Sequence, residues 1–158
     1  HVWTVKTSKQ LEKPRFIFLA FQTDRKGQKG VICSHFDHCN IRNVKLFLNS
    51  QYYPYGDLNL NITEGQYSLL YSMFSKFQSS YYNKDPEPIL DRKSFIEQLP
   101  IIIIDCSKQN ESLKTAPVDV RLEFDARAAF PANTTAYCLI LHDRMVEYNP
   151  LNGDVKKL

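Results

Sequence analysis

The chain has 158 residues, of which 43% are hydrophobic and 23% are charged, with a formal net charge of +3. This length suits one domain, which buries ~70% of its unfolded surface and needs no disulfide or metal to be stable. The 20 basic and 17 acidic residues are spread along the chain without a basic run, so no specific nucleic-acid partner is indicated. No apolar segment approaches the ~20 residues of a membrane span.

Strand patterns fill the first part of the chain. Residues 1–6 alternate between apolar and polar side chains, which is typical of a half-buried strand. Residues 15–23 form a continuous apolar run that predicts a strand buried on both faces. Residues 25–30 are polar and contain Gly, which indicates a loop. Residues 41–50 alternate again, and the sequence QYYPYGD then predicts a turn at Pro54 and Gly56.

One long helix is predicted over residues 63–82. Thr63 and Gln66 have the spacing of a capping box, in which each side chain bonds the backbone of the other. Aromatic and aliphatic residues recur behind them at three- and four-residue spacing, which favours a helix packed on the core. A short helical turn is predicted near residues 94–98.

The second half returns to strands, at residues 101–107, 118–126 and 134–143, followed by a hairpin around Asn152-Gly153. In 118–126 the alternation places Val118, Val120, Leu122 and Phe124 inside. About eight strands separated by turns predict a mainly β fold, an antiparallel eight-stranded jelly-roll sandwich with one inserted helix.

The segment CSHFDHCN contains four potential metal ligands, Cys33, His35, His38 and Cys39. Structural zinc sites use two close ligand pairs separated by a longer loop, and the sequence has no second pair. If Cys39 enters a strand, His38 and Cys39 also point to opposite faces. We therefore predict no metal here, but a loop in which Phe36 anchors in the core and its polar neighbours bond local backbone.

Catalysis is not indicated either. Cys106 and His142, each beside an Asp, could be imagined as a nucleophile and its base. Cys106 follows four isoleucines, however, which favours an inert buried thiol. We expect reduced cysteines, folding in a reducing intracellular environment, no cofactor and no enzymatic activity. Aromatic segments that the pattern places at the surface, together with long polar loops, instead favour a binding or assembly function.

Four segments carry a family resemblance: TSKQLEKPRFIFLAFQT, FDHCNIRNVKLFLNSQYYPYGDLNL, DCSKQNESLKTAPVDVRLEF and PANTTAYCLILHDRMVEYNPLNGDVKKL. They resemble the C-terminal part of the double jelly-roll major capsid proteins of Polinton (Maverick) elements and adintoviruses, including endogenous copies in animal genomes. The resemblance implies that residues 1–158 are one jelly roll, the C-terminal half of a protein whose N-terminal jelly roll is absent here. It implies no catalytic residues.

The same resemblance implies a structural virion protein that forms a homotrimer, a pseudo-hexameric capsomer of an icosahedral capsid, beside penton and minor capsid proteins. We expect subunit contacts in the aromatic turn and in the polar loop that follows residue 107. The alternative is an isolated or host-retained jelly roll that binds a glycan or a protein without assembling a shell. The candidate contact residues are Tyr52, Tyr53, Tyr55, Lys108, Asn110 and Glu111.

Overall fold

The computed structural model describes residues 1–5, 14–108, 118–142 and 146–157, and the description below concerns these residues. They form nine strands and two helices, where the sequence pattern predicted about eight strands, one long helix and a short helical turn near residues 94–98. The elements are β1 (Val2–Val5), β2 (Pro14–Thr23), β3 (Ile41–Leu48), β4 (Gln51–Tyr53), α1 (Ser68–Tyr82), α2 (Arg92–Gln98), β5 (Ile102–Asp105), β6 (Val120–Ala126), β7 (Thr134–His142), β8 (Val146–Tyr148) and β9 (Val155–Lys157).

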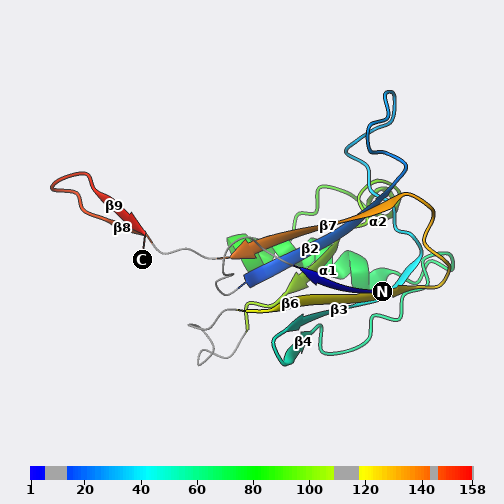
Figure 1. The fold of residues 1–158 in the computed structure, drawn as a ribbon, viewed down its shortest axis with the longest axis horizontal. Helices are drawn as coiled ribbons and strands as arrows, with labels where there is room; N and C mark the ends of the chain where they lie inside the picture. The colour runs from blue at the N-terminus through cyan, green and yellow to red at the C-terminus, as the bar shows by residue number, and fades with distance from the viewer. Residues whose placement is uncertain (6–13, 109–117, 143–145, 158) are drawn as a thin grey trace.

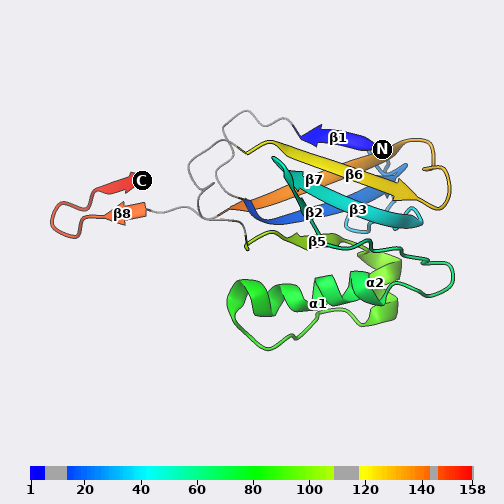
Figure 2. The same cartoon turned by 90° about the horizontal axis from the view of Figure 1, so that it is seen from below.

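Seven strands form two antiparallel sheets that face each other, as Figures 1 and 2 show. One sheet has four strands in the order β1-β6-β3-β4, and the other has three in the order β5-β2-β7. The predicted antiparallel sandwich is confirmed. The predicted turn at QYYPYGD begins with the short strand β4, and the cis peptide bond between Tyr53 and Pro54 follows it.

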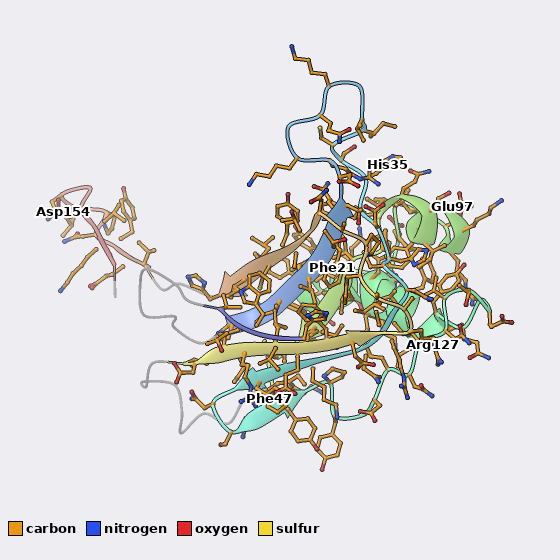
Figure 3. The ribbon with its side chains drawn as sticks, turned by 45° about the vertical axis from the view of Figure 1, so that its right-hand side comes forward. Phe21, His35, Phe47, Glu97, Arg127 and Asp154 are labelled. Atoms are coloured by element: carbon orange, nitrogen blue, oxygen red, sulfur yellow. The ribbon has the colours of Figure 1, made fainter. Side chains whose placement is uncertain are left out.

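The core lies between the two sheets, where alternate residues of each strand point inward. Figure 3 shows Phe21 of β2 in this interior and Phe47 of β3 on the outer side of the four-stranded sheet. The inward side chains predicted for 118–126 point inward, and Val120 and Leu122 are fully buried. β2 is buried along most of its length, which agrees with its continuous apolar sequence.

Helix α1 begins at Ser68, five residues after the predicted start, and the predicted capping box is wrong. The Thr63 hydroxyl donates to Asn61 Oδ1 at 2.9 Å, and Asn61 pairs with Gln66 in an isolated β-bridge. These residues close a tight turn with Gly65 at φ +70°, a conformation that favours glycine. The local turn therefore engages the Thr63 hydroxyl and the Gln66 backbone in contacts with Asn61 instead of in a helix cap.

Both helices pack against the sandwich. Leu70 of α1 is fully buried, and Tyr71 and Phe74 lie against the core, as the helical spacing predicted. The ring centres of Phe74 and Phe95 are 4.7 Å apart, which joins α1 to α2. Asp91 caps α2 by accepting a hydrogen bond from the Ser94 backbone N–H at 2.8 Å.

Strands β8 and β9 form the predicted hairpin, with Gly153 at φ +73° in its turn. Figures 1 and 2 show this hairpin apart from the sandwich. Tyr148 and Val155 face each other across its two strands, and both side chains are exposed.

Candidate interaction surface

A row of aromatic and cationic side chains lies on the outer face of the four-stranded sheet. Phe47 of β3 is the cross-strand partner of Tyr52 on one side and of Arg121 on the other, so the three side chains share one face. The guanidinium carbon of Arg121 lies 4.4 Å from the Phe47 ring centre, and the Phe47 and Tyr52 ring centres are 6.0 Å apart. Tyr55 stacks on Tyr52 with ring centres 6.0 Å apart and an interplanar angle of 16°. We call these four residues the aromatic row.

A lysine and an aspartate hold one side of the aromatic row. Lys45 Nζ lies 5.4 Å from the Tyr52 ring centre and 2.7 Å from Asp57 Oδ1. The hydrogen bond with Asp57 raises the pKa of Lys45, and the same bond lowers the pKa of Asp57. Arg121 Nε in turn lies 3.3 Å from Glu123 Oε1. The two carboxylates therefore hold the cations of Lys45 and Arg121 beside aromatic rings, where cation–π attraction operates.

The candidate contact residues predicted from the sequence fall in three different settings. Tyr52 and Tyr55 are exposed on the aromatic row, and Tyr55 retains 91% of its accessible surface. Tyr53 instead packs against the core, and burial raises the pKa of its phenol. Lys108 is exposed. Asn110 and Glu111 lie outside the described residues. The sequence pattern did not single out Phe47 and Arg121, because their alternation alone indicated only an outer strand face.

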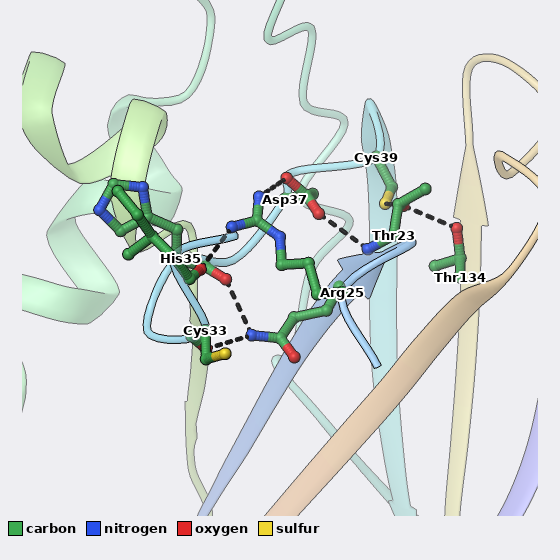
Figure 4. Close-up of polar contacts among 9 residues, drawn as sticks. Thr23, Arg25, Cys33, His35, Asp37, Cys39 and Thr134 are labelled. Atoms are coloured by element: carbon green, nitrogen blue, oxygen red, sulfur yellow. Dashed lines mark hydrogen bonds and ion pairs between the residues drawn. The ribbon is translucent and has the colours of Figure 1, made fainter. Parts of the chain in front are cut away.

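The four metal-ligand candidates in the segment CSHFDHCN do not converge. Figure 4 shows Cys33 and Cys39 on opposite sides of the ion pair between Arg25 and Asp37, whose nearest atoms are 2.5 Å apart. His38 Nδ1 accepts a hydrogen bond from the Asn40 backbone N–H at 3.0 Å, and burial lowers its pKa. No group of three or more His, Cys, Asp or Glu side chains in the described part of the chain could hold a metal ion.

The local structure of this segment corrects two predictions. Cys39 does not enter a strand: Cys39 and Asn40 have φ of +45° and +49° and form a left-handed turn before β3 begins at Ile41. Phe36 does not anchor in the central core either. Its ring meets Tyr137 with ring centres 6.4 Å apart, on the outer face of β7.

Polar contacts with β2 hold the rest of the segment. Of the predicted bonds to local backbone His38 makes one, whereas Asn40 Oδ1 is buried without a hydrogen-bond partner among the described residues. Asp37 Oδ2 accepts a hydrogen bond from the Thr23 backbone N–H at 2.8 Å, and the Gln22 amide donates to the carbonyls of Cys33 and His35 at 2.8 Å each (Figure 4). These bonds satisfy loop backbone groups that would otherwise be left without a partner.

Cys106, the cysteine considered as a nucleophile, and the other three cysteines are all free thiols. Cys106 is fully buried, and its thiol donates to the Pro14 carbonyl with an S···O distance of 3.3 Å. Burial raises the pKa of Cys138 to about 11, which disfavours the reactive thiolate. Cys33 and Cys39 are also thiols.

A separate feature is an apolar cavity of about 390 Å³ between α1 and β5, which Phe16, Met73 and Phe77 help to line.

A scan against protein families matches residues 1–146 to the double jelly roll-like domain. The chain belongs to this family. The predicted jelly-roll sandwich is therefore confirmed. The double jelly roll-like domain is typical of viral capsid proteins, where it is a structural and generally non-enzymatic fold. Comparisons with curated proteins and with solved structures give no significant match.

No helix in the described residues has the length and apolar character needed to cross a membrane.

Proposed function

We propose that this double jelly roll-like protein is a structural building block of a capsid shell. The carrying observation is the family match over residues 1–146, which coincides with a folded two-sheet sandwich. The sequence segments that resemble Polinton and adintovirus major capsid proteins support a finer assignment to that lineage. In this proposal residues 1–158 are the C-terminal jelly roll of the capsid protein, and the mature product resides in the virion.

The proposed assembly is a homotrimer that acts as a pseudo-hexameric capsomer, with penton and minor capsid proteins as further partners. A heterologous contact repeated around a threefold axis closes a ring without a self-complementary patch. The aromatic row is our proposed contribution to that contact. Tyrosine and arginine are among the residue types enriched at energetically important interface positions, and Tyr55 projects almost fully into solvent.

The trimer can be tested with the product of the complete reading frame by light scattering coupled to size-exclusion chromatography. We expect the mass of three chains, and the double variant Tyr52→Ala with Tyr55→Ala should lower the trimer fraction at micromolar concentration. The control is Tyr82→Ala, which removes another exposed tyrosine side chain, from the end of α1 and away from the aromatic row. Trimers that are equally stable in the double variant would exclude the aromatic row as the contact.

One observation favours the alternative of a binding module for a glycan or protein ligand. The exposed, stacked rings of Tyr52 and Tyr55 with Lys45 beside them form a flat platform of the kind that sugar rings can cover. A glycan array followed by NMR titration tests it. A saturable ligand whose binding is lost in Tyr55→Ala, while the oligomeric mass is unchanged, would favour this function over capsid assembly.

A further inference from the structure

The turn of the β8–β9 hairpin presents an apolar side chain to solvent. Leu151 lies between the two strands and retains 96% of its accessible surface, the highest value among the exposed large hydrophobic side chains of the described residues. Val146, Tyr148 and Val155 of the same hairpin are also exposed. Burial of such side chains against apolar surface is favourable, so the hairpin offers a contact surface that its own chain does not use.

Hydrogen bonds within the turn hold Leu151 in place. Its backbone N–H donates to Asn149 Oδ1 at 3.0 Å, and the Gly153 N–H donates to the Asn149 carbonyl at 2.9 Å. On the other side of the turn, the Asn152 amide donates to Asp154 Oδ2 at 2.6 Å and accepts from the Asp154 N–H at 3.0 Å. A side chain on an ordered turn loses little conformational freedom on binding, which favours a docking role.

The hairpin stands apart from its own sandwich. Figures 1 and 2 show it beyond the end of β7, with the turn as its part farthest from the sandwich. Among the described residues, no hydrogen bond, ion pair or ring contact joins the two. The family match ends at residue 146, where β8 begins, so the double jelly roll-like domain does not account for the hairpin. An isolated two-stranded hairpin is at best marginally stable in water, which indicates that this one packs against a partner.

The cavity between α1 and β5 has the apolar walls that such a side chain needs. Its lining comes from the outer side of the smaller sheet and from one side of α1, and it includes Phe16, Ile103, Leu69, Met73 and Phe77. Leu69 is an exposed side chain, so the cavity opens to solvent beside it. An apolar cavity with an opening of this kind binds apolar groups in preference to water.

The size of the cavity suits the tip of the turn. Its volume is about 390 Å³. At roughly 30 Å³ for each heavy atom, the volume of one water in the liquid, the side chains of Leu151 and the adjacent Pro150 together occupy roughly 210 Å³. The cavity therefore has room for both side chains without a rearrangement of its walls.

Three charged residues line the mouth of the cavity. Asp57 is paired with Lys45 at 2.7 Å, whereas Asp105 accepts hydrogen bonds from the neutral Ser107. Lys76 is exposed and forms no ion pair with any residue that the structure describes. One cation and one anion at the mouth thus have no charged partner in the described part of the chain.

The hairpin carries the complementary charges. Asp154 and Lys156 follow Leu151 by three and five residues, and neither forms an ion pair within the described ranges. With Leu151 in the cavity, one arrangement of the hairpin brings Asp154 toward Lys76 and Lys156 toward Asp105, while the reverse arrangement opposes like charges. Such complementarity selects one orientation of a contact.

The second copy is the occupant that these features indicate. The turn is directed away from the sandwich that contains its own cavity, so it is available to another molecule. Each chain carries both the projecting turn and the cavity that receives it. Two different patches on one chain that complement each other produce a heterologous contact between copies.

We propose that the turn of the β8–β9 hairpin, with Leu151 at its tip, docks into the cavity between α1 and β5 of a second copy of this chain. Each copy then gives one hairpin and receives another, and repetition of the contact closes a ring or continues as an open array. The inference rests on the proposed function in that copies of the chain must meet, and it names a contact separate from the aromatic row.

Cysteine cross-linking between two kinds of chain tests the contact. Both are 158-residue chains with the exposed Cys33 changed to Ser; one carries Leu151→Cys and the other Met73→Cys, and they are mixed under a mild oxidant. We expect a disulfide that joins one chain of each kind, identified by mass spectrometry of the linked peptides. Its yield should exceed by roughly tenfold that of a control mixture of Leu151→Cys with Leu139→Cys, because docking raises the local concentration of the paired thiols. Leu139 is exposed on β7, outside the cavity lining.

Methionine methyl NMR tests the contact without a change to the cavity. The sequence has only two methionines, Met73 and Met145, so a Met145→Leu chain assigns the Met73 signal. We expect this signal to shift as the chain concentration rises from micromolar to millimolar. Leu151→Ala should weaken the association by roughly tenfold or more, since it removes most of the inserted apolar surface. Leu139→Ala is the matched control and should leave the shift unchanged.

Three outcomes would overturn the proposal. A Met73 signal that does not depend on concentration would leave the cavity to another occupant, and an equal shift in Leu151→Ala would exclude the turn. An intrachain disulfide in the Leu151→Cys and Met73→Cys double variant, without a link between chains in the mixture, would show that each hairpin folds onto its own cavity. The capsid proposal has a separate readout, because a trimeric mass that persists without the cross-link overturns only this contact.

Discussion

The guanidinium of Arg121 lies over the Phe47 ring, 4.4 Å from its centre, across the neighbouring strands β6 and β3. The two residues are direct cross-strand partners, so the register of the sheet sets this contact. Glu123 also pairs with the guanidinium, with its Oε1 lying 3.3 Å from Arg121 Nε. The planar guanidinium of Arg121 therefore extends the aromatic row onto the neighbouring strand β6, and its charge stays at the surface.

Removing this cation should weaken the sheet modestly. We expect Arg121→Ala to lower the free energy of unfolding by about 0.5–1 kcal/mol, the usual size of an exposed cation–π contact. Arg121→Lys keeps the charge but loses the planar group that stacks, so it should recover only part of the loss. Urea unfolding followed by fluorescence measures both. Lys156→Ala on the separate hairpin is the control, and an equal loss there would contradict the assignment.

The carboxylate of Asp37 should stabilise the loop between β2 and β3. It accepts from the Thr23 backbone N–H and pairs with Arg25, so Asp37→Ala leaves a donor and a cation without their acceptor. We expect a loss of about 1–3 kcal/mol in unfolding free energy. Trypsin should also cut faster after Lys26 and Lys29.

Asp37→Asn is the informative companion variant. It retains an oxygen that can accept from Thr23 while it removes the negative charge that pairs with Arg25. Its stability should lie between those of the wild type and Asp37→Ala. Equal stability of all three proteins would show that the contacts contribute nothing.

Phe95 should be essential for attaching α2 to the sandwich. The side chain is fully buried and its ring contacts Tyr71 and Phe74 of α1. We expect Phe95→Ala to lower the free energy of unfolding by about 3–5 kcal/mol, because it removes a large buried ring and leaves a cavity. The control is Ile89→Ala, whose side chain is 77% exposed. Thermal unfolding by circular dichroism distinguishes them, and similar melting temperatures would refute the role of Phe95.

The fold was predictable where hydrophobic periodicity decides burial. The alternation in residues 118–126 gave both the strand β6 and its inward face, and the continuous run in residues 15–23 gave the buried strand β2. The helix start was not predictable from the same kind of rule. Thr63 and Gln66 match a capping box, but in the turn at Gly65 the Thr63 hydroxyl bonds the Asn61 side chain and the Gln66 backbone pairs with Asn61 in a β-bridge. Local motifs fail when a neighbouring turn offers the same groups other partners.

The candidate surface was only partly predictable, because it depends on which strands become neighbours. The cluster of tyrosines in residues 52–55 is visible in the sequence, and two of the three are exposed. Phe47 and Arg121 are 74 positions apart, and only the register of β3 with β6 brings them together. Cys39 was misassigned for a different reason. A left-handed turn at a non-glycine residue has little sequence signature, although Asn40 is a residue type that tolerates it.

Alkaline pH should destabilise the protein through Cys138. Burial raises the pKa of this thiol from 9.0 to about 11, so the folded state keeps its proton where the unfolded chain releases it. Stability from this group is therefore fully present below pH 9 and is lost as the pH rises toward 11. Burial raises the pKa values of Cys39 and Tyr53 in the same direction. Urea unfolding between pH 8 and 11 should show a decline that is shallower in Cys138→Ala and unchanged in Cys33→Ala, whose side chain is exposed. An identical decline in wild type and Cys138→Ala would rule out this thiol as a cause.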